Sequence, residues 1–322
     1  MTKKLTLEYC IEDIADFHVS PSLAVENTLR ARDSVQSEFP DIELSLLPYG
    51  RIKSIFTGGR NPKFERDKFL RIAKELNGVK IACAVVLNGG LLMPRNMELS
   101  WGDPRMEDIK ATLDTLAESD VDNAVTIYHD ALLDVVHERY PDLKKIASCI
   151  RFVGGRKGEF KNEPGDDEYD KAFADKRFSY IVPLNQHTTY DFLKRFEGDA
   201  DRIIAFLSSG CCSDDLYQCY HHYCGTERGN LITMPNKLRR SCDLFNTPDK
   251  DQFAYIKSGV YENSFSSCRC GQLYSRPRDF GKLVQMGVNK YKVPPEESAD
   301  TTTTFWLKGM NILRELININ ED

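Results

Sequence analysis

The sequence predicts a (β/α)₈ barrel that forms one domain over residues 1–322. Eight short apolar segments indicate strands, and most of them are followed by a segment with helical periodicity. One segment, residues 79–87 (VKIACAVVL), is almost wholly apolar, which is typical of a strand buried on both faces in a parallel sheet. A doubly wound open sheet is the main alternative. The first βα turn lacks the Gly-x-Gly-x-x-Gly pattern of a dinucleotide-binding sheet, so the barrel is favoured.

Predicted strands and helices alternate through the first half of the chain. Apolar residues at spacings of three and four mark the helices, and Ser20-Pro21 is a start signal for the first of them. The strands are expected at residues 5–10, 42–47, 79–87, 123–128 and 145–150, and the helices at 22–37, 63–76, 106–117 and 131–140.

The second half contains a long interruption of this alternation. Residues 154–167 are rich in glycine and charge and are expected to form a loop. Strands are expected at 180–184, 202–207 and 289–293, and helices at 188–196, 278–286 and 301–317. Residues 208–275 show little periodicity and are expected to be an insertion after the seventh strand. It would begin at the C-terminal ends of the strands, where barrel enzymes hold their active sites.

The composition indicates the cellular compartment and excludes some classes of partner. A net charge of −6 and an isoelectric point near 5.7 argue against a nucleic-acid coat protein or a basic membrane-surface protein. The N-terminus has no apolar signal segment, and no run of eighteen apolar residues occurs. We therefore expect a cytoplasmic protein with no membrane contact, in which thiols stay reduced.

Seven of the ten cysteines lie within residues 211–270. In a reducing compartment such crowding indicates metal ligands rather than disulfides. Thiolates bind iron–sulfur clusters and zinc, so a [4Fe–4S] cluster is expected, with zinc as the alternative. His221 and His222 would supply a ligand to a mixed zinc site. The candidate ligands are one of Cys211 and Cys212, then Cys219, Cys224 and one of Cys268 and Cys270, with Cys242 in reserve.

The remaining three cysteines, Cys10, Cys83 and Cys149, fall inside predicted strands. Free cysteine in such a position behaves as a small apolar side chain. Cys83 is therefore expected to pack in the core, whereas Cys10 and Cys149 lie nearer to strand ends.

Four parts of the chain carry a resemblance to a known family. They are Phe56-Thr-Gly-Gly-Arg60 after the second strand, residues 79–89 with Asn88, residues 121–149, and residues 276–293. The third part contains VDNAVTIYHDALL, YPDL and IASC, and the fourth contains RPRDF and MGVNKYKV. In these segments the chain resembles the peptidase U32 family and its U32-like members, and the resemblance covers most of the chain.

The resemblance implies a (β/α)₈ barrel whose cysteines after strand seven bind a [4Fe–4S] cluster. It also implies oxygen-independent hydroxylation of ubiquinone precursors or of RNA bases. The spacing Cys212-x₆-Cys219 matches a pairing in the family. The later Asn-Arg-Gly-x-Cys-x-x-x-Cys passage has no clean equivalent, and Thr226-Glu-Arg-Gly-Asn230 is only similar to its beginning. The identity of the four ligands is therefore open.

Five polar residues at or near strand ends are expected at the barrel mouth: Glu8, Asn88, His129, Asn185 and Lys292. Of these, Asn88, His129 and Lys292 are the candidate catalytic residues and would orient an organic anion. His129 fits a helix-capping or solvent-facing position equally well. Lys290 and Lys292 alternate along the eighth strand and should face the same side, toward either an anionic substrate or solvent.

Together these features favour a U32-like iron–sulfur enzyme. We expect an oxygen-independent hydroxylase or a related redox-linked enzyme that acts on a small aromatic or anionic substrate or on an RNA base. One alternative is a non-catalytic accessory barrel, stabilised by zinc or a cluster, that forms a heterodimer with a second U32-like chain. The other is a peptidase, although no Gly-x-Ser-x-Gly, His-Glu-x-x-His or P-loop motif supports hydrolysis.

Overall fold

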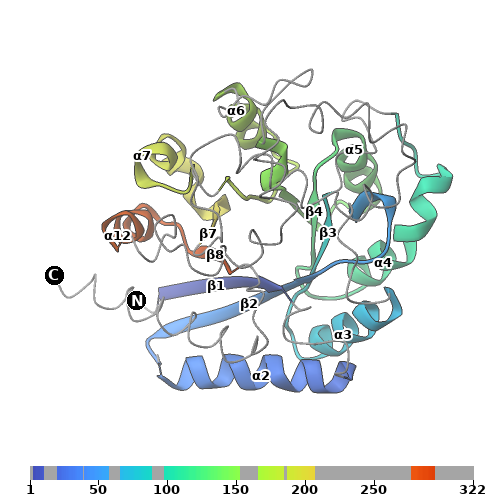
Figure 1. Ribbon diagram of the computed structural model, residues 1–322, viewed down its shortest axis with the longest axis horizontal. Helices are drawn as coiled ribbons and strands as arrows, with labels where there is room; N and C mark the ends of the chain where they lie inside the picture. The colour runs from blue at the N-terminus through green and yellow to red at the C-terminus, as the bar shows by residue number, and fades with distance from the viewer. Residues whose placement is uncertain are drawn as a thin grey trace, which may run out of the picture.

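The computed structural model describes residues 3–10, 20–38, 40–57, 66–88, 98–152, 166–184, 187–206 and 277–293. Within these ranges eight parallel strands follow the order β6-β5-β4-β3-β2-β1-β8-β7, and a parallel bridge between Ile181 and Ile203 joins the two edges. Helices alternate with the strands and lie outside the ring (Figure 1). The fold is therefore a nearly closed (β/α)₈ barrel, as the sequence predicts.

The strands lie where the sequence places them, with differences at their ends. They are β1 (Lys3–Cys10), β2 (Ile42–Gly50), β3 (Ala84–Leu87), β4 (Ala124–Ile127), β5 (Lys144–Ala147), β6 (Tyr180–Ile181), β7 (Ile204–Phe206) and β8 (Lys290–Val293).

The helices around the barrel are α2 (Pro21–Glu38), α3 (Arg66–Gly78), α4 (Glu107–Ala117), α5 (Asp130–Arg139), α6 (Asp166–Ala174), α7 (Tyr190–Leu193) and α12 (Pro277–Met286). Short 3₁₀ helices are η1 (Ile55–Thr57), η2 (Pro104–Met106), η3 (Cys149–Phe152) and η6 (Lys194–Arg202). The start signal before α2 is confirmed, because the Ser20 hydroxyl accepts a hydrogen bond from the Leu23 amide at 3.2 Å.

Several predicted strands are shorter than expected, and the predicted strands 180–184 and 202–207 are reduced to Tyr180–Ile181 and Ile204–Phe206. The apolar run at 79–87 begins in the turn after α3, where Lys80 has a φ of 63° and the Ile81 amide donates back to the Leu76 carbonyl at 2.9 Å. The predicted strand 145–150 ends at Ala147, since the Arg151 amide turns back to the Ser148 carbonyl. Cys149 therefore lies in η3 and not in a strand.

Two helices also differ from the sequence interpretation. The predicted loop at 154–167 overlaps the start of α6, a helix that was not predicted. The predicted helix 188–196 is only one turn of α7, followed by η6 with non-helical backbone at Phe196 and Asp199. The predicted insertion 208–275 and the predicted helix 301–317 lie outside the described residues. Within the described ranges, no helix combines the length and apolarity that crossing a bilayer requires.

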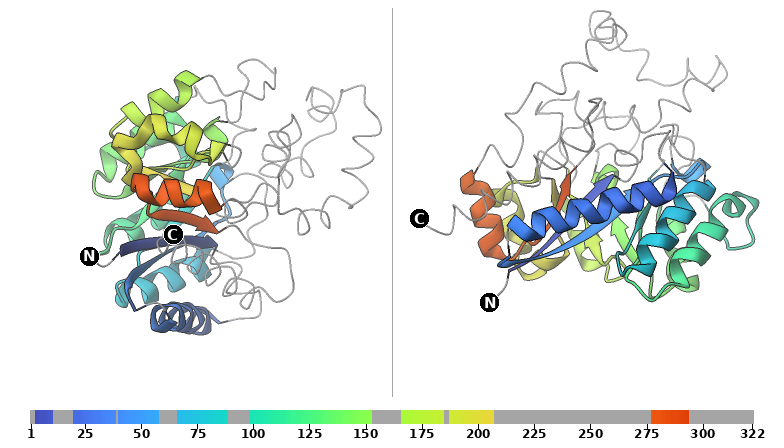
Figure 2. Two further views of the ribbon diagram at one scale, coloured as in Figure 1. Left: turned by 90° about the vertical axis from the view of Figure 1, so that its left-hand side faces the viewer. Right: turned by 90° about the horizontal axis from the view of Figure 1, so that it is seen from below.

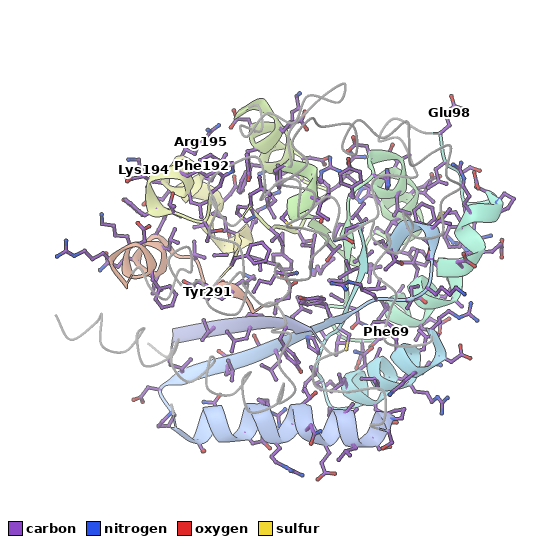
Figure 3. All side chains as sticks on the ribbon, viewed as in Figure 1. Phe69, Glu98, Phe192, Lys194, Arg195 and Tyr291 are labelled. Atoms are coloured by element: carbon purple, nitrogen blue, oxygen red, sulfur yellow. The ribbon has the colours of Figure 1, made fainter. Side chains whose placement is uncertain are left out.

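Side chains of the strands alternate between two apolar layers. The outer layer fills the space between strands and helices, and Figure 3 labels two of its members, Phe69 on α3 and Tyr291 on β8. The inner layer fills the barrel and contains Leu47, Tyr49, Ala84, Val86, Ala124, Ile146, Val182, Ile204 and Phe206. On β1 the outer positions are Leu5, Leu7 and Tyr9, so Glu8 has the inward position between two of them.

The first and last strands lie side by side. Figure 2 shows the arrows of β1 and β8 pointing the same way, with α12 outside β8. Their register pairs Glu8 with Lys292, and Phe206 of β7 pairs with the same lysine. These positions lie near the C-terminal ends of their strands, so the barrel mouth receives polar groups from strands at opposite ends of the chain.

Candidate active site at the barrel mouth

A buried ion pair joins β1 to β8 inside the barrel. The Lys292 ammonium donates to Glu8 Oε1, and the side chains are 12% and 1% exposed, respectively. The sequence analysis left open whether Lys292 faces solvent, and this burial shows that it does not. Lys290 faces the same side, as predicted, but it lies closer to the N-terminal end and its Nζ donates to the Asp201 carbonyl at 2.6 Å. Desolvation at this position lowers the Lys290 pKa from its ordinary value.

Aromatic rings surround the Lys292 ammonium. Its Nζ lies 4.0 Å from the centroid of the Tyr49 ring and 6.0 Å from that of Phe206. Tyr49 is on β2, two strands away from β8, and inward-facing side chains of alternate strands form one layer in such barrels. Both rings are buried members of the inner layer. They attract the ammonium through cation–π interactions and exclude water from it.

Two buried oxygen atoms in the barrel interior make no hydrogen bond to any described residue. They are Glu8 Oε2 and Thr126 Oγ1, and Thr126 is 3% exposed. Thr126 has the inward position on β4 between the outer-layer residues Val125 and Ile127. A buried acceptor without a donor costs about 1–3 kcal/mol, and more when it is charged. The interior therefore offers polar atoms that a bound molecule or water would satisfy.

Asn88 follows β3 directly and is partly exposed. Its strand pairs with β4 in a register that continues to the Tyr128 amide, which donates to the Leu87 carbonyl at 3.3 Å. Asn88 thus lies at the mouth on the β3–β4 side, whereas Lys292 lies on the β1–β8 side. The remaining amide candidate, Asn185, lies outside the described residues.

His129 is fully buried, which rules out the solvent-facing interpretation. It occupies the N-cap position of α5, but its side chain makes no capping hydrogen bond. Its ring contacts the Tyr128 ring edge to face, with centroids 4.7 Å apart. Among the three candidate catalytic residues, His129 is the least accessible to a molecule that enters from the mouth.

Arg151 is a buried residue near the mouth that the sequence analysis missed. One guanidinium nitrogen donates to the Tyr128 carbonyl and another to Asp130 Oδ1, each at 2.5 Å. The guanidinium also lies 5.0 Å from the centroid of the Phe178 ring. Arg151 therefore ties the segment after β5 to the segment after β4. No local motif marks this arginine, because its partners are more than twenty residues away.

The candidate metal ligands cannot be placed. Cys211, Cys212, Cys219, Cys224, Cys242, Cys268 and Cys270 all lie outside the described residues, as do His221 and His222. In the part of the chain that the structure describes, no three His, Cys, Asp or Glu side chains form a group that could hold a metal ion. The cysteine segment, residues 211–270, follows β7 in the sequence, and β7 ends on the same side of the barrel as Glu8 and Lys292.

The described cysteines have different environments. Cys83 is fully buried in the outer layer, and desolvation raises the pKa of its thiol far above the ordinary value. A thiol in that environment is inert, so the predicted packing role of Cys83 is confirmed. Cys149 is partly exposed and packs against both apolar layers at the mouth.

Comparisons with known proteins identify no family. No protein-family model and no curated protein matches the chain. A search of solved structures finds a similarity to a structure titled "PhdJ bound to substrate intermediate", with 12% sequence identity, coverage of 99% of this chain and 97% of that chain, and a TM-score of 0.36. A similarity of that size carries no conclusion about this chain.

Proposed function

We propose that the protein is an enzyme whose active site lies at the barrel mouth, and that it belongs to the U32-like iron–sulfur proteins. The proposed activity is an oxygen-independent hydroxylation, or a related redox-linked modification, of a small organic substrate. Three features support the proposal: the segment resemblance, the cysteines crowded after β7, and the buried pair of Glu8 and Lys292.

The Glu8–Lys292 pair is the observation that carries the enzyme proposal. Burying two charges has a desolvation cost that well-packed apolar residues avoid. Barrel interiors are ordinarily filled with branched aliphatic side chains. A charged pair at the C-terminal end of the strands, with one carboxylate oxygen left without a described partner, is therefore better explained by chemistry than by stability.

We assign distinct roles to Glu8, Lys292 and Asn88. Glu8 would act as the general base, because replacing a C–H bond by C–OH releases a proton, and an organic oxygen donor would accept the two electrons that the substrate loses. Lys292, which donates to Glu8 Oε1, would return a proton to an oxygen atom of the substrate. Asn88, on the opposite side of the mouth, would orient the substrate through its amide. When bound by the cysteine segment, a [4Fe–4S] cluster would supply electron transfer.

The first test is the metal content of protein purified without oxygen. We expect about four irons and four acid-labile sulfides per chain, with a broad absorption band near about 400 nm. Cys219→Ala should lose the cluster, whereas Cys149→Ser, outside the cysteine segment, should retain it. One zinc and no sulfide would instead make the segment a structural zinc site and remove the redox proposal.

The second test addresses the enzyme proposal itself. Untargeted mass spectrometry of cells that express the wild-type chain should reveal a compound that gains one oxygen atom. Its amount should fall with Cys219→Ala and with Glu8→Gln, although Glu8→Gln should retain full iron. Equal amounts of the compound in wild-type and Glu8→Gln cells would contradict the role of Glu8.

A further inference from the structure

The Glu8–Lys292 pair offers an acceptor and a donor next to each other. An ammonium has three N–H donors, and among the described residues only Glu8 Oε1 accepts from Lys292. The carboxylate has a second oxygen, Oε2, without a partner in the described chain. The two side chains therefore present unused N–H groups and an unused carboxylate oxygen side by side.

The charge of the lysine is largely neutralised by its partner. Lys292 would be an anion-binding group if it stood alone, but a ligand carboxylate that approached its ammonium would also approach Glu8. Like Glu8, a ligand carboxylate accepts hydrogen bonds and donates none, so it could not donate to Glu8. The arrangement therefore favours binding of a group that accepts from Lys292 and donates to Glu8. It disfavours binding of a group that carries a second negative charge.

We propose that this pair binds an uncharged substrate group that has an acceptor and a donor side by side, namely a primary amide or a hydroxyl, and that it rejects carboxylates. The inference rests on the proposed function, since it names the substrate class of the same site. The group approaches alongside the Lys292 side chain, which retains 12% exposure, and donates to Glu8 Oε2, which has no partner among the described residues. The rings of Tyr49 and Phe206 keep bulk water from competing.

The test compares two probes of the same shape, benzamide and benzoate, by titration calorimetry with the full-length protein. Wild type should bind benzamide about tenfold or more tightly than benzoate, the difference expected when one ligand pairs a buried charged group and the other leaves it unsatisfied. Glu8→Gln should reverse this preference, because a neutral amide leaves the Lys292 charge available to benzoate. Equal binding of both probes to wild type would overturn the proposal.

Control variants separate binding from folding. Glu26→Gln on α2 and Lys282→Met on α12 change exposed residues of the same types and should leave the preference unchanged. Lys292→Met alone leaves a buried carboxylate uncompensated and is expected to destabilise the fold. The double variant Glu8→Leu/Lys292→Met removes both charges and should fold, but it should bind neither probe. Retained benzamide binding by this folded double variant would contradict the site.

The outcome of the calorimetric test does not depend on the iron–sulfur proposal. The calorimetric preference depends on Glu8 and Lys292, whereas iron and sulfide content depends on the cysteine segment. A benzamide preference in protein without iron would support the binding site and reject the iron–sulfur function. Full iron with no preference between the probes would reject the binding site alone.

Discussion

At the scale of single residues, buried polar side chains are held by specific partners. Asn77 and Asn123 exchange amide hydrogen bonds of 3.0 and 2.9 Å between α3 and the start of β4. Asn123 also accepts from the Cys83 amide at 2.7 Å and donates to the Leu116 carbonyl at 2.9 Å. One side chain thus satisfies a backbone amide next to β3 and a backbone carbonyl in α4.

Replacing Asn123 should therefore destabilise the fold. Asn123→Ala would leave the Cys83 amide and the Leu116 carbonyl without their partners, and we expect a loss of about 3 kcal/mol in the free energy of unfolding. Urea denaturation measures this loss. The neighbouring exposed residue Asp122 provides the control, since Asp122→Ala should change stability by less than about 0.5 kcal/mol. Similar losses for the two variants would contradict the role of the amide pair.

Lys145 is a second buried polar residue, with a 1% exposed side chain. Its Nζ donates to the carbonyls of Tyr140 and Pro141, at 2.6 and 2.7 Å, just after α5. It therefore caps the C-terminus of that helix, where the helix dipole favours a cation. Desolvation lowers the pKa of Lys145 from 10.5 to about 8.

This pKa predicts a dependence of stability on pH. Between about 8 and 10.5 the unfolded chain binds the Lys145 proton more tightly than the folded protein does, so the free energy of unfolding rises with pH. Relative to Lys145→Met, wild type should gain up to about 3 kcal/mol between about pH 7 and pH 10. The comparison cancels the buried tyrosines and Cys83, whose raised pKa values act in the opposite direction. A stability difference that does not change with pH would contradict the burial of the charge.

Residue roles are only partly predictable from the sequence. Glu8 and Lys292 could be predicted as mouth residues because strand ends and side-chain alternation are local properties. Their pairing could not be predicted, since it joins positions 284 residues apart. The role of Arg151 could not be predicted, because its partners Tyr128 and Asp130 are more than twenty residues away. The partners of Lys145 are only four and five residues away, but no side-chain pattern marks backbone carbonyls as its partners.

At the scale of elements, Arg202 links η6 to the last turn of α6 and to the segment between α6 and β6. Its guanidinium donates to the carbonyls of Phe173, Asp175 and Phe178 at distances of 2.7, 3.2 and 2.9 Å. A fourth bond, to Asp199 Oδ1 at 2.7 Å, fixes the side chain. This link holds a 3₁₀ segment whose backbone departs from helical geometry and whose own hydrogen bonds are correspondingly weak.

Arg202→Lys should weaken this link because an ammonium cannot reproduce the planar fork of the guanidinium. We expect a loss of about 1–3 kcal/mol, measured by thermal or urea unfolding. Arg195 lies on the same element at the outer surface, near Phe192 and Lys194 (Figure 3). Its guanidinium contacts the exposed Asp170 carboxylate at 2.7 Å, and exposed ion pairs contribute little to stability, so Arg195→Lys should have a much smaller effect. Equal losses for the two variants would contradict the carbonyl link.

The element boundaries show where local patterns fail. The apolar run at 79–87 predicts nine strand residues, but Lys80 adopts a positive φ and the strand begins at Ala84. A turn stabilised by the end of α3 overrides the strand preference of Val79 and Ile81. Helix α6 was missed because its polar, acidic start resembles the preceding loop in composition.

At the scale of the whole molecule, the barrel is closed unevenly. β1 and β2 pair over eight aligned positions, whereas β6 and β7 are joined by the single bridge between Ile181 and Ile203. β6 itself contains only two residues. Among the described residues, the β6–β7 junction therefore has the weakest lateral hydrogen bonding in the ring.

Hydrogen exchange should detect this difference. Backbone amides of β6 and β7 should exchange faster than those at the centre of β1 and β2, because local opening costs less where fewer bonds break. Mass spectrometry with deuterium labelling measures both regions in one experiment. Slower exchange at the β6–β7 junction than in β1 would show that closure is tighter than the strand pairing indicates.

The ion pair between the first and last strands also sets the order of events during synthesis. Glu8 is synthesised 284 residues before its partner Lys292, which lies in β8, the last of the described strands. Until β8 docks, an inward-facing carboxylate has no cation, and enclosing it would have a large desolvation cost. We therefore expect the growing chain to remain an open sheet with Glu8 in water. Any nascent chain that terminates before Lys292 would then stay open and would be accessible to proteases.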